Sequence, residues 1–135
     1  MKLIILTILC LGILQTAYAQ NDVPPYDSPT KPVNCEMGYV FINDALGRYI
    51  KNPSNYFIVI ARLGSGESSR RLNLNRIKTL KSYISNLNPP VKAIFAEGEN
   101  IKGYGVIEMY VEGKLLYSLP LDKGENLDLR TCLTP

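Results

Sequence analysis

The chain has 135 residues, with 15 lysines and arginines against 12 aspartates and glutamates, and a formal net charge of +3. It has no histidine, which excludes Ser-His-Asp and Cys-His catalysis, His-ligated zinc and the usual general base near neutral pH. The acids are scattered without an obvious catalytic pair, and no cysteines stand at metal-ligand spacing. We therefore expect no enzyme, no metal and no other cofactor, and the charge is too mild to indicate a nucleic-acid partner.

Residues 1–19 have the pattern of a secretory signal peptide. Lys2 precedes the apolar run LIILTILCLGIL, and AYA at residues 17–19 is a small-residue cleavage site. The run is short for a membrane span and a polar segment follows it, so an uncleaved anchor is the less favoured alternative. Cys10 lacks the neighbouring small residues of a lipoprotein signal. We expect an exported protein, periplasmic or secreted, with no transmembrane segment after cleavage and a mature charge of +2 once Lys2 is removed.

Residues 20–34, QNDVPPYDSPTKPVN, contain four prolines and almost no apolar residue. This composition predicts an extended tether outside the core. Residues 35–135 are enough for one small domain with one core. Loss of Cys10 with the signal peptide leaves Cys35 and Cys132 near the two ends of that domain. In an exported chain we favour a disulfide between them over two free thiols or an intermolecular bond.

The first elements of the domain are a helix and a strand. YVFINDALGRYIKNPSN, residues 39–55, has apolar residues at helical spacing, with Asn43 or Asp44 as a cap or first-turn residue and Pro53 beyond the end. YFIVIARL, residues 56–63, is rich in β-branched and aromatic residues, which predicts a central strand. GSGES then forms a tight loop, in which Ser65 or Ser68 is expected to cap the next helix.

The second helix is predicted from Arg70 to about Asn86, before Pro89-Pro90. Its apolar residues occupy an arc of roughly 140° at 100° per residue. Asn73 and Arg76 fall inside this arc, whereas Arg70 and the other basic residues of the helix lie opposite it. A polar and a charged residue on the apolar face therefore require an explanation.

The remaining chain predicts three strands and a polar tail. VKAIFAEG, residues 91–98, is the first strand, and GYGVIEMYVEGKLLYSLPL contains two more around a turn at Glu112-Gly113. Between them, AEGENIKGYG is expected to be a connection whose glycines take positive φ. DKGENLDLRTC is predicted to carry Cys132 back to the start of the domain. The order helix, strand, helix and three strands predicts a two-layer α+β sandwich with the helices on one face of the sheet.

These residues resemble the OmpA-like, or peptidoglycan-associated, domain family. The second helix of that family carries Leu-Ser, two residues, Arg-Ala, two residues, Val, two residues, Tyr-Leu. Here Leu72-Asn73 is followed at that spacing by Arg76-Ile77, Leu80 and Tyr83-Ile84. INDALGRYIKNPSNYFIVIARLG is similar to the family's first helix, linking segment and second strand, and AIFAEGEN to a later strand and turn. The resemblance covers roughly residues 35–100 and implies a helix-strand-helix-strand core, to which this chain adds a C-terminal hairpin.

The resemblance implies peptidoglycan binding, in which an arginine and a loop aspartate hold the diaminopimelate group of a stem peptide. Arg76 matches the arginine, and a guanidinium suits a carboxylate because it donates two parallel hydrogen bonds. The chain departs from the family pattern because IARLGSGE has no aspartate. Glu67 is the nearest acid, and Arg62 could assist Arg76 in holding a carboxylate or another anion of the envelope.

Two interpretations of Arg76 stay open. It recognises an anion, or it is structural, with its stem on apolar side chains and its head in solvent or on the last carbonyls of a neighbouring strand. Asn73 is expected to bond to backbone in the GSGES connection. The sequence therefore predicts a non-catalytic envelope-binding module of OmpA-like type. The alternative is a degenerate member that binds no peptidoglycan and interacts with an envelope protein through its sheet edge or basic helix.

Overall fold

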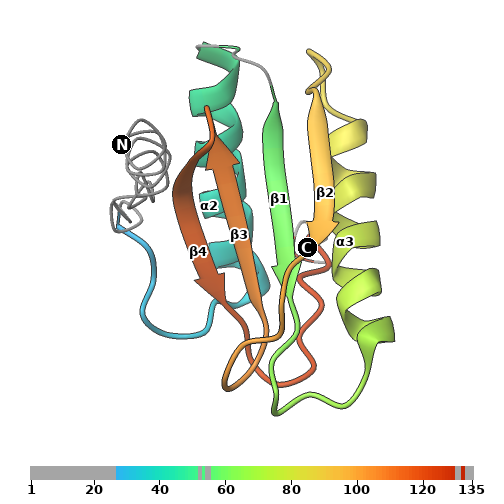
Figure 1. Cartoon of the computed structure of the whole chain (residues 1–135). Coiled ribbons are helices and arrows are strands. Elements are labelled where there is room, and N and C mark those ends of the chain that lie inside the picture. The colour runs from blue at the N-terminus through green and yellow to red at the C-terminus, as the bar shows by residue number, and fades with distance from the viewer. Residues whose placement is uncertain (1–26, 52, 54–55, 130–131, 133–135) are drawn as a thin grey trace, which may run out of the picture.

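The computed structural model describes residues 27–51, 53, 56–129 and 132. The predicted signal peptide, residues 1–19, lies outside the described residues, as does the first part of the predicted tether. The elements, in chain order, are α2 (Cys35–Lys51), β1 (Phe57–Arg62), α3 (Arg70–Ser85), β2 (Ala93–Glu97), β3 (Val106–Val111) and β4 (Lys114–Pro120). The predicted α+β class and element order are confirmed (Figure 1).

The four strands form one mixed sheet in the order β2-β1-β3-β4. The parallel pair β1 and β2 is joined through α3, whereas β3 runs antiparallel to β1 and β4 antiparallel to β3. Side chains of β1 alternate between buried and partly exposed, as expected for a strand with one covered face. The covered face packs against both helices in one hydrophobic core, whose members include Ile42, Leu46, Phe57, Val59, Leu80, Ile84, Ile107 and Met109.

The predicted disulfide between Cys35 and Cys132 is present, with the two Cα atoms 5.9 Å apart. It joins the first residue of α2 to the C-terminal segment across 97 positions of sequence. In the chain-entropy description, a bridge over a loop of this length contributes about 4–5 kcal/mol to stability. The two ends of the described domain are thus tied together.

The predicted start of the first helix was wrong, whereas the second helix begins at Arg70 as predicted. The first helix begins at Cys35, and the Asn34 side chain caps it by accepting a 2.9 Å hydrogen bond from the Met37 amide. Asn43 and Asp44 consequently lie in the helix interior. Gly38 concealed this start because glycine disfavours a helix, but here it makes room for Leu127, whose side chain would lie 2.9 Å from an added Cβ.

The cap of α3 is Ser69 rather than Ser65 or Ser68. Its hydroxyl accepts a 3.2 Å hydrogen bond from the Arg71 amide, and its backbone is extended, as an N-cap requires. The predicted turn at Glu112-Gly113 is confirmed, because both residues have positive φ, 55° and 73°. Of the glycines in AEGENIKGYG, only Gly103 has the predicted positive φ, at 89°.

Both polar ends of the domain contribute to the core. Val33, from the predicted tether, is buried, and its amide donates a 2.9 Å hydrogen bond to the Pro120 carbonyl. Leu127 and Leu129, from the polar tail, are fully buried. A single apolar residue in a polar stretch has no periodicity, so these contributions were not predicted. Among the described residues, no helix is both long and apolar enough to cross a membrane.

Candidate functional site

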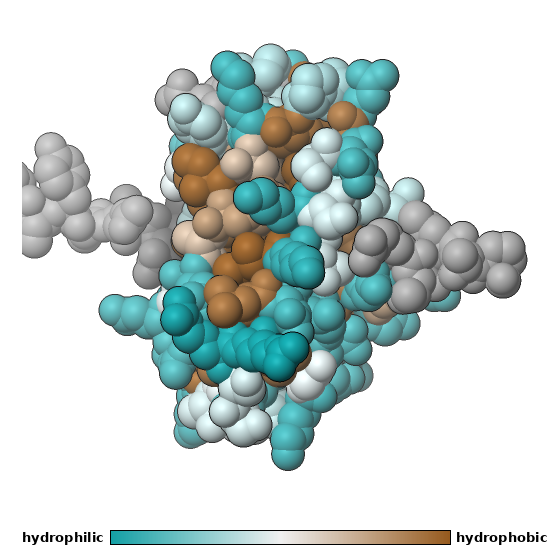
Figure 2. Space-filling model, turned by 90° about the vertical axis from the view of Figure 1, so that its right-hand side faces the viewer, coloured by the Kyte–Doolittle hydropathy of each residue, from teal (hydrophilic) through white to brown (hydrophobic). Residues whose placement is uncertain are grey.

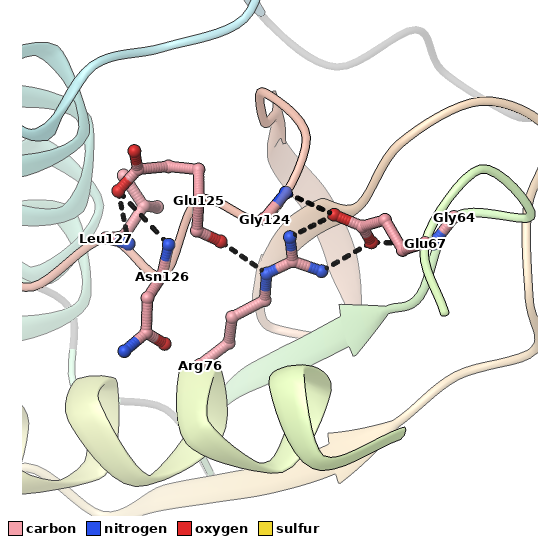
Figure 3. Close-up of polar contacts among 7 residues, drawn as sticks. All are labelled: Gly64, Glu67, Arg76, Gly124, Glu125, Asn126 and Leu127. Carbon is pink, nitrogen blue, oxygen red and sulfur yellow. Dashed lines mark hydrogen bonds and ion pairs between the residues drawn. The ribbon is translucent and has the colours of Figure 1, made fainter. Parts of the chain in front are cut away.

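The structure brings Arg76 and Glu67 together and leaves Arg62 apart. Arg76 lies in the second turn of α3, and Glu67 lies in the loop between β1 and α3. The guanidinium holds the carboxylate by two hydrogen bonds, Nη1 to Oε2 at 2.8 Å and Nη2 to Oε1 at 2.5 Å (Figure 3). Of the two side chains, Arg76 is 0% and Glu67 is 1% exposed. This is a buried, bidentate ion pair.

Backbone groups from distant segments complete the enclosure of this pair. Arg76 Nε donates a 2.8 Å hydrogen bond to the carbonyl of Glu125. The Glu67 carboxylate also accepts hydrogen bonds from the amides of Gly64, at 3.0 Å, and Gly124, at 3.2 Å. Figure 3 shows these partners arranged around the guanidinium and the carboxylate. Both charged groups are therefore satisfied inside the chain, as buried charges must be.

A glycine closes another side of the site. A Cβ added to Gly105 would lie 2.1 Å from Nη1 of Arg76, so only glycine permits this approach without displacing the guanidinium. Gly105 is buried and directly precedes β3. Its carbonyl accepts a 2.9 Å hydrogen bond from the Leu121 amide, at the end of β4. The guanidinium is thus held between α3, the start of β3 and the C-terminal segment.

The electrostatics of Glu67 follow from this setting. Burial by itself would raise the pKa of Glu67, but the hydrogen bonds from Arg76, Gly64 and Gly124 outweigh it and lower the pKa to about 2. The carboxylate is consequently ionised at neutral pH. Its role is to neutralise Arg76, because it has neither an exposed surface nor a proton to donate.

Asn73 has a structural contact, although not the one predicted. Its Nδ2 donates to the carbonyl of Ala61 at 3.0 Å and to Glu97 Oε1 at 3.3 Å. It thus joins α3 to the ends of β1 and β2 rather than to the GSGES loop. Its Oδ1 is buried and has no hydrogen-bond partner among the described residues. The burial of Asn73 on the apolar face is explained by its two hydrogen bonds, to the Ala61 carbonyl and to the Glu97 carboxylate, which satisfy its buried amide nitrogen.

Arg62 points to the other side of the sheet. Adjacent residues of a strand face opposite ways, and its neighbour Ala61 faces the core. Arg62 Nε pairs with Glu108 Oε1 at 2.9 Å, and the Tyr110 hydroxyl donates to Glu108 Oε2 at 2.9 Å. Arg62 therefore belongs to a cross-strand cluster on the open face of the sheet, separate from Arg76.

Sequence reasoning missed Glu125, Gly124 and Gly105. The first two act through backbone groups, which any residue supplies, so no side-chain pattern marks them. The carboxylate of Glu125 instead accepts from the amides of Asn126 and Leu127, at 3.1 and 2.9 Å, and so holds its own loop in shape.

Open hollows lie elsewhere on the surface. A groove of about 570 Å³ lies between α2 and the β3–β4 turn, with Asp44 and Arg48 among its lining residues. Asp44 accepts hydrogen bonds from Tyr117 at 2.5 Å and Arg48 at 2.7 Å, and both lower its pKa. Its carboxylate is thus occupied within the chain. In the described part of the chain, no three His, Cys, Asp or Glu residues form a group able to hold a metal ion.

Comparisons with protein-family models, curated proteins and solved structures find no match to this chain.

Proposed function

We propose that this protein is an exported, non-catalytic interaction or scaffolding module of the cell envelope that engages another protein. One observation carries the proposal: one edge of the sheet is covered by the chain itself, whereas the other edge has no strand paired with it among the described residues. The edge strand β4 is covered by residues 28–33, through the Ser118 amide on Ser28 Oγ at 2.9 Å and the Val33 amide on the Pro120 carbonyl. No described strand pairs with the outer edge of β2. An open strand edge is a template for pairing with another chain.

The buried state of Arg76 favours this function over recognition of a stem peptide. Each nitrogen of its guanidinium already donates within the chain. A ligand carboxylate would have to displace Glu67, which would leave a buried carboxylate unpaired at a cost of several kcal/mol. The interaction module requires no such rearrangement.

A photo-crosslinking residue at Ile94 tests this function. Ile94 is an exposed residue of β2, and Val40 is an exposed residue of α2 that serves as the matched control. We expect a discrete protein adduct in intact cells from position 94 and none of the same size from position 40. The absence of an adduct at position 94, or identical adducts at both positions, would contradict the proposal.

Peptidoglycan binding through Arg76 is the second candidate. The observation in its favour is that Glu67 lies beside Arg76, so that the acid and the arginine implied by the OmpA-like resemblance are both at one place. It predicts that the wild-type protein sediments with purified peptidoglycan and that free diaminopimelate competes. The interaction module predicts no sedimentation above that of an unrelated protein of similar charge.

A further inference from the structure

We propose that the outer edge of β2, together with the neighbouring surface of α3, binds an extended acidic segment of a partner protein by strand addition. This inference rests on the proposed function and adds the site and the chemistry of the partner. We call this surface the β2–α3 edge. It consists of Leu74 and Lys81 of α3, which lie on the same side of the helix as the Arg70 that pairs with Glu97, together with Lys92 and the strand Ala93–Glu97.

The backbone of β2 offers hydrogen-bonding groups to an incoming strand. Lys92 accepts from the Phe57 amide through its carbonyl, and the Gly98 amide donates to the Ala61 carbonyl, so both residues face β1. Alternate residues of a strand direct their backbone groups to opposite sides. The N–H and C=O groups of Ala93, Phe95 and Glu97 therefore point away from β1, in the direction of the open edge.

Apolar side chains border these backbone groups on both faces of the sheet. Ile94 is 43% exposed on the open face of the sheet, and Leu74 is 44% exposed on α3, which packs on β1 and β2. Figure 2 views the molecule from the side where α3 and β2 lie, and shows apolar patches bordered by hydrophilic residues. An added strand alternates its side chains between the two faces, so it would cover apolar surface on each.

The charges of this surface select an acidic partner. Every charged residue between Ser68 and Ala96 is basic. Arg76 is neutralised by Glu67 and Arg70 by Glu97. The others, Arg71, Lys78, Lys81 and Lys92, are exposed and form no ion pair with an acid among the described residues.

Self-association is disfavoured by the same charges. Two copies pairing through β2 would bring their Lys81 and Lys92 side chains close to one another, and like charges across a strand pair are destabilising. A partner segment with glutamates or aspartates removes this repulsion and gains electrostatic steering. The occupant that fits is thus an acidic extended segment of a different protein.

A peptide of alternating valine and glutamate is the probe, and alternating valine and lysine is its charge-reversed control. We expect the acidic peptide to bind the full mature chain, with binding that weakens as salt is added. We also expect the amides of Ala93, Phe95 and Glu97 to become slow in hydrogen exchange, because the added strand bonds them. Equal binding of the lysine peptide, or unchanged exchange at these amides, would overturn the inference.

Two variants separate charge from backbone pairing. The double variant Lys81→Glu, Lys92→Glu should weaken binding about tenfold, because it replaces attraction of the acidic peptide by repulsion. Lys114→Glu, Lys123→Glu makes the same charge change at exposed positions outside the β2–α3 edge and should leave affinity unchanged. Ala93→Pro removes an outward amide without removing a bond to β1, and should also weaken binding.

Other occupants give distinct results. A dimer in sedimentation equilibrium that Ala93→Pro abolishes would replace the partner by a second copy and overturn the inference. Equal binding to vesicles of anionic lipid, unaffected by Ala93→Pro, would do the same in favour of a membrane surface. An adduct at Ile94 without binding of the acidic peptide would refute the partner's chemistry alone, whereas loss of the adduct would refute the proposed function.

Discussion

Arg70 and Arg76 lie six positions apart in the same helix, and each pairs with a glutamate from another part of the chain. Arg70 Nη2 is 2.7 Å from Glu97 Oε2, and its side chain is 77% exposed. Arg76 pairs with Glu67 at a similar distance with no exposure at all. Both pairs join α3 to the sheet or to one of its loops. Their N–O distances are similar, so distance does not distinguish the two pairs.

Burial makes the two pairs physically different. In the exposed pair, each charged group gives up hydrogen bonds to water when it binds its partner, so the net gain in stability is small. Salt also screens the attraction. The buried pair has no access to water, so either residue alone would be an uncompensated charge in the interior. An arginine on an apolar helix face can therefore be held entirely within the chain, while the basic residues on the other face lie in solvent.

Removing Arg76 should have the largest effect. Arg76→Ala leaves Glu67 buried and unpaired, and we expect the free energy of unfolding to fall by about 3–5 kcal/mol. Chemical denaturation measures this loss, with Arg70→Ala as the matched control in the same helix. Equal losses from the two variants would show that burial does not make the Arg76 pair more important for stability than the exposed Arg70 pair.

Acid should weaken the buried pair next. The pKa of Glu67 is lowered from 4.5 to about 2 in the folded protein. Its contribution is therefore complete above the unfolded value and is lost as the pH falls from about 4.5 to about 2. The loss amounts to about 3 kcal/mol. Unfolding free energies measured across this range should show the slope in the wild type, and Glu67→Gln should reduce it. The same slope in both proteins would assign it to other carboxylates.

Crowding the guanidinium of Arg76 should lower the stability of the protein by a smaller amount than the two changes above. In Gly105→Ala the new methyl group meets Nη1 of Arg76, and we expect the protein to lose about 1–3 kcal/mol as the ion pair shifts. Gly47→Ala is the control, because nothing lies within 4 Å of its added Cβ and alanine favours the helix interior by up to about 1 kcal/mol. Thermal unfolding should move in opposite directions for the two variants. A stabilising Gly105→Ala would refute the close approach.

The exposed pair should give the smallest effect. Arg70→Ala is expected to change stability by less than about 1 kcal/mol, and added salt should erase the difference from the wild type. Denaturation at low and high salt measures both quantities. A loss that persists at high salt would mean that the stem of Arg70, rather than its charge, supports β2.

The elements that were predicted correctly have strong local signals. A short stretch of sequence is enough to predict each of three elements. These are β1 from its β-branched run, α3 from its amphipathic period, and the turn at Glu112-Gly113. The disulfide was predictable because Cys35 and Cys132 are the two cysteines outside the predicted signal peptide. The finer OmpA-like assignment and its ligand stay predictions.

The parts that were missed depend on long-range contacts. Leu127 sits in a polar tail, and only the fold reveals that it fills the space above Gly38 in α2. The position of Glu67 beside Arg76 depends on how the loop after β1 turns, which the letters GSGES do not determine. Arg76 Nε donates to the backbone carbonyl of Glu125, and every residue has such a carbonyl. Which residue accepts this hydrogen bond therefore depends on the tertiary path of the chain.

The enclosure of Arg76 also makes the interior of the domain depend on residues that follow β4. Every helix and strand of the described chain ends by Pro120, yet the amide of Gly124 and the carbonyl of Glu125 come later. A chain shortened after Pro120 would contain the whole sheet and both helices, but its central ion pair would lie open to water. Such a fragment would expose core surface in the place of Leu127 and Leu129 and become a target for proteolysis. The interior of the domain thus depends on a segment that follows the last described strand.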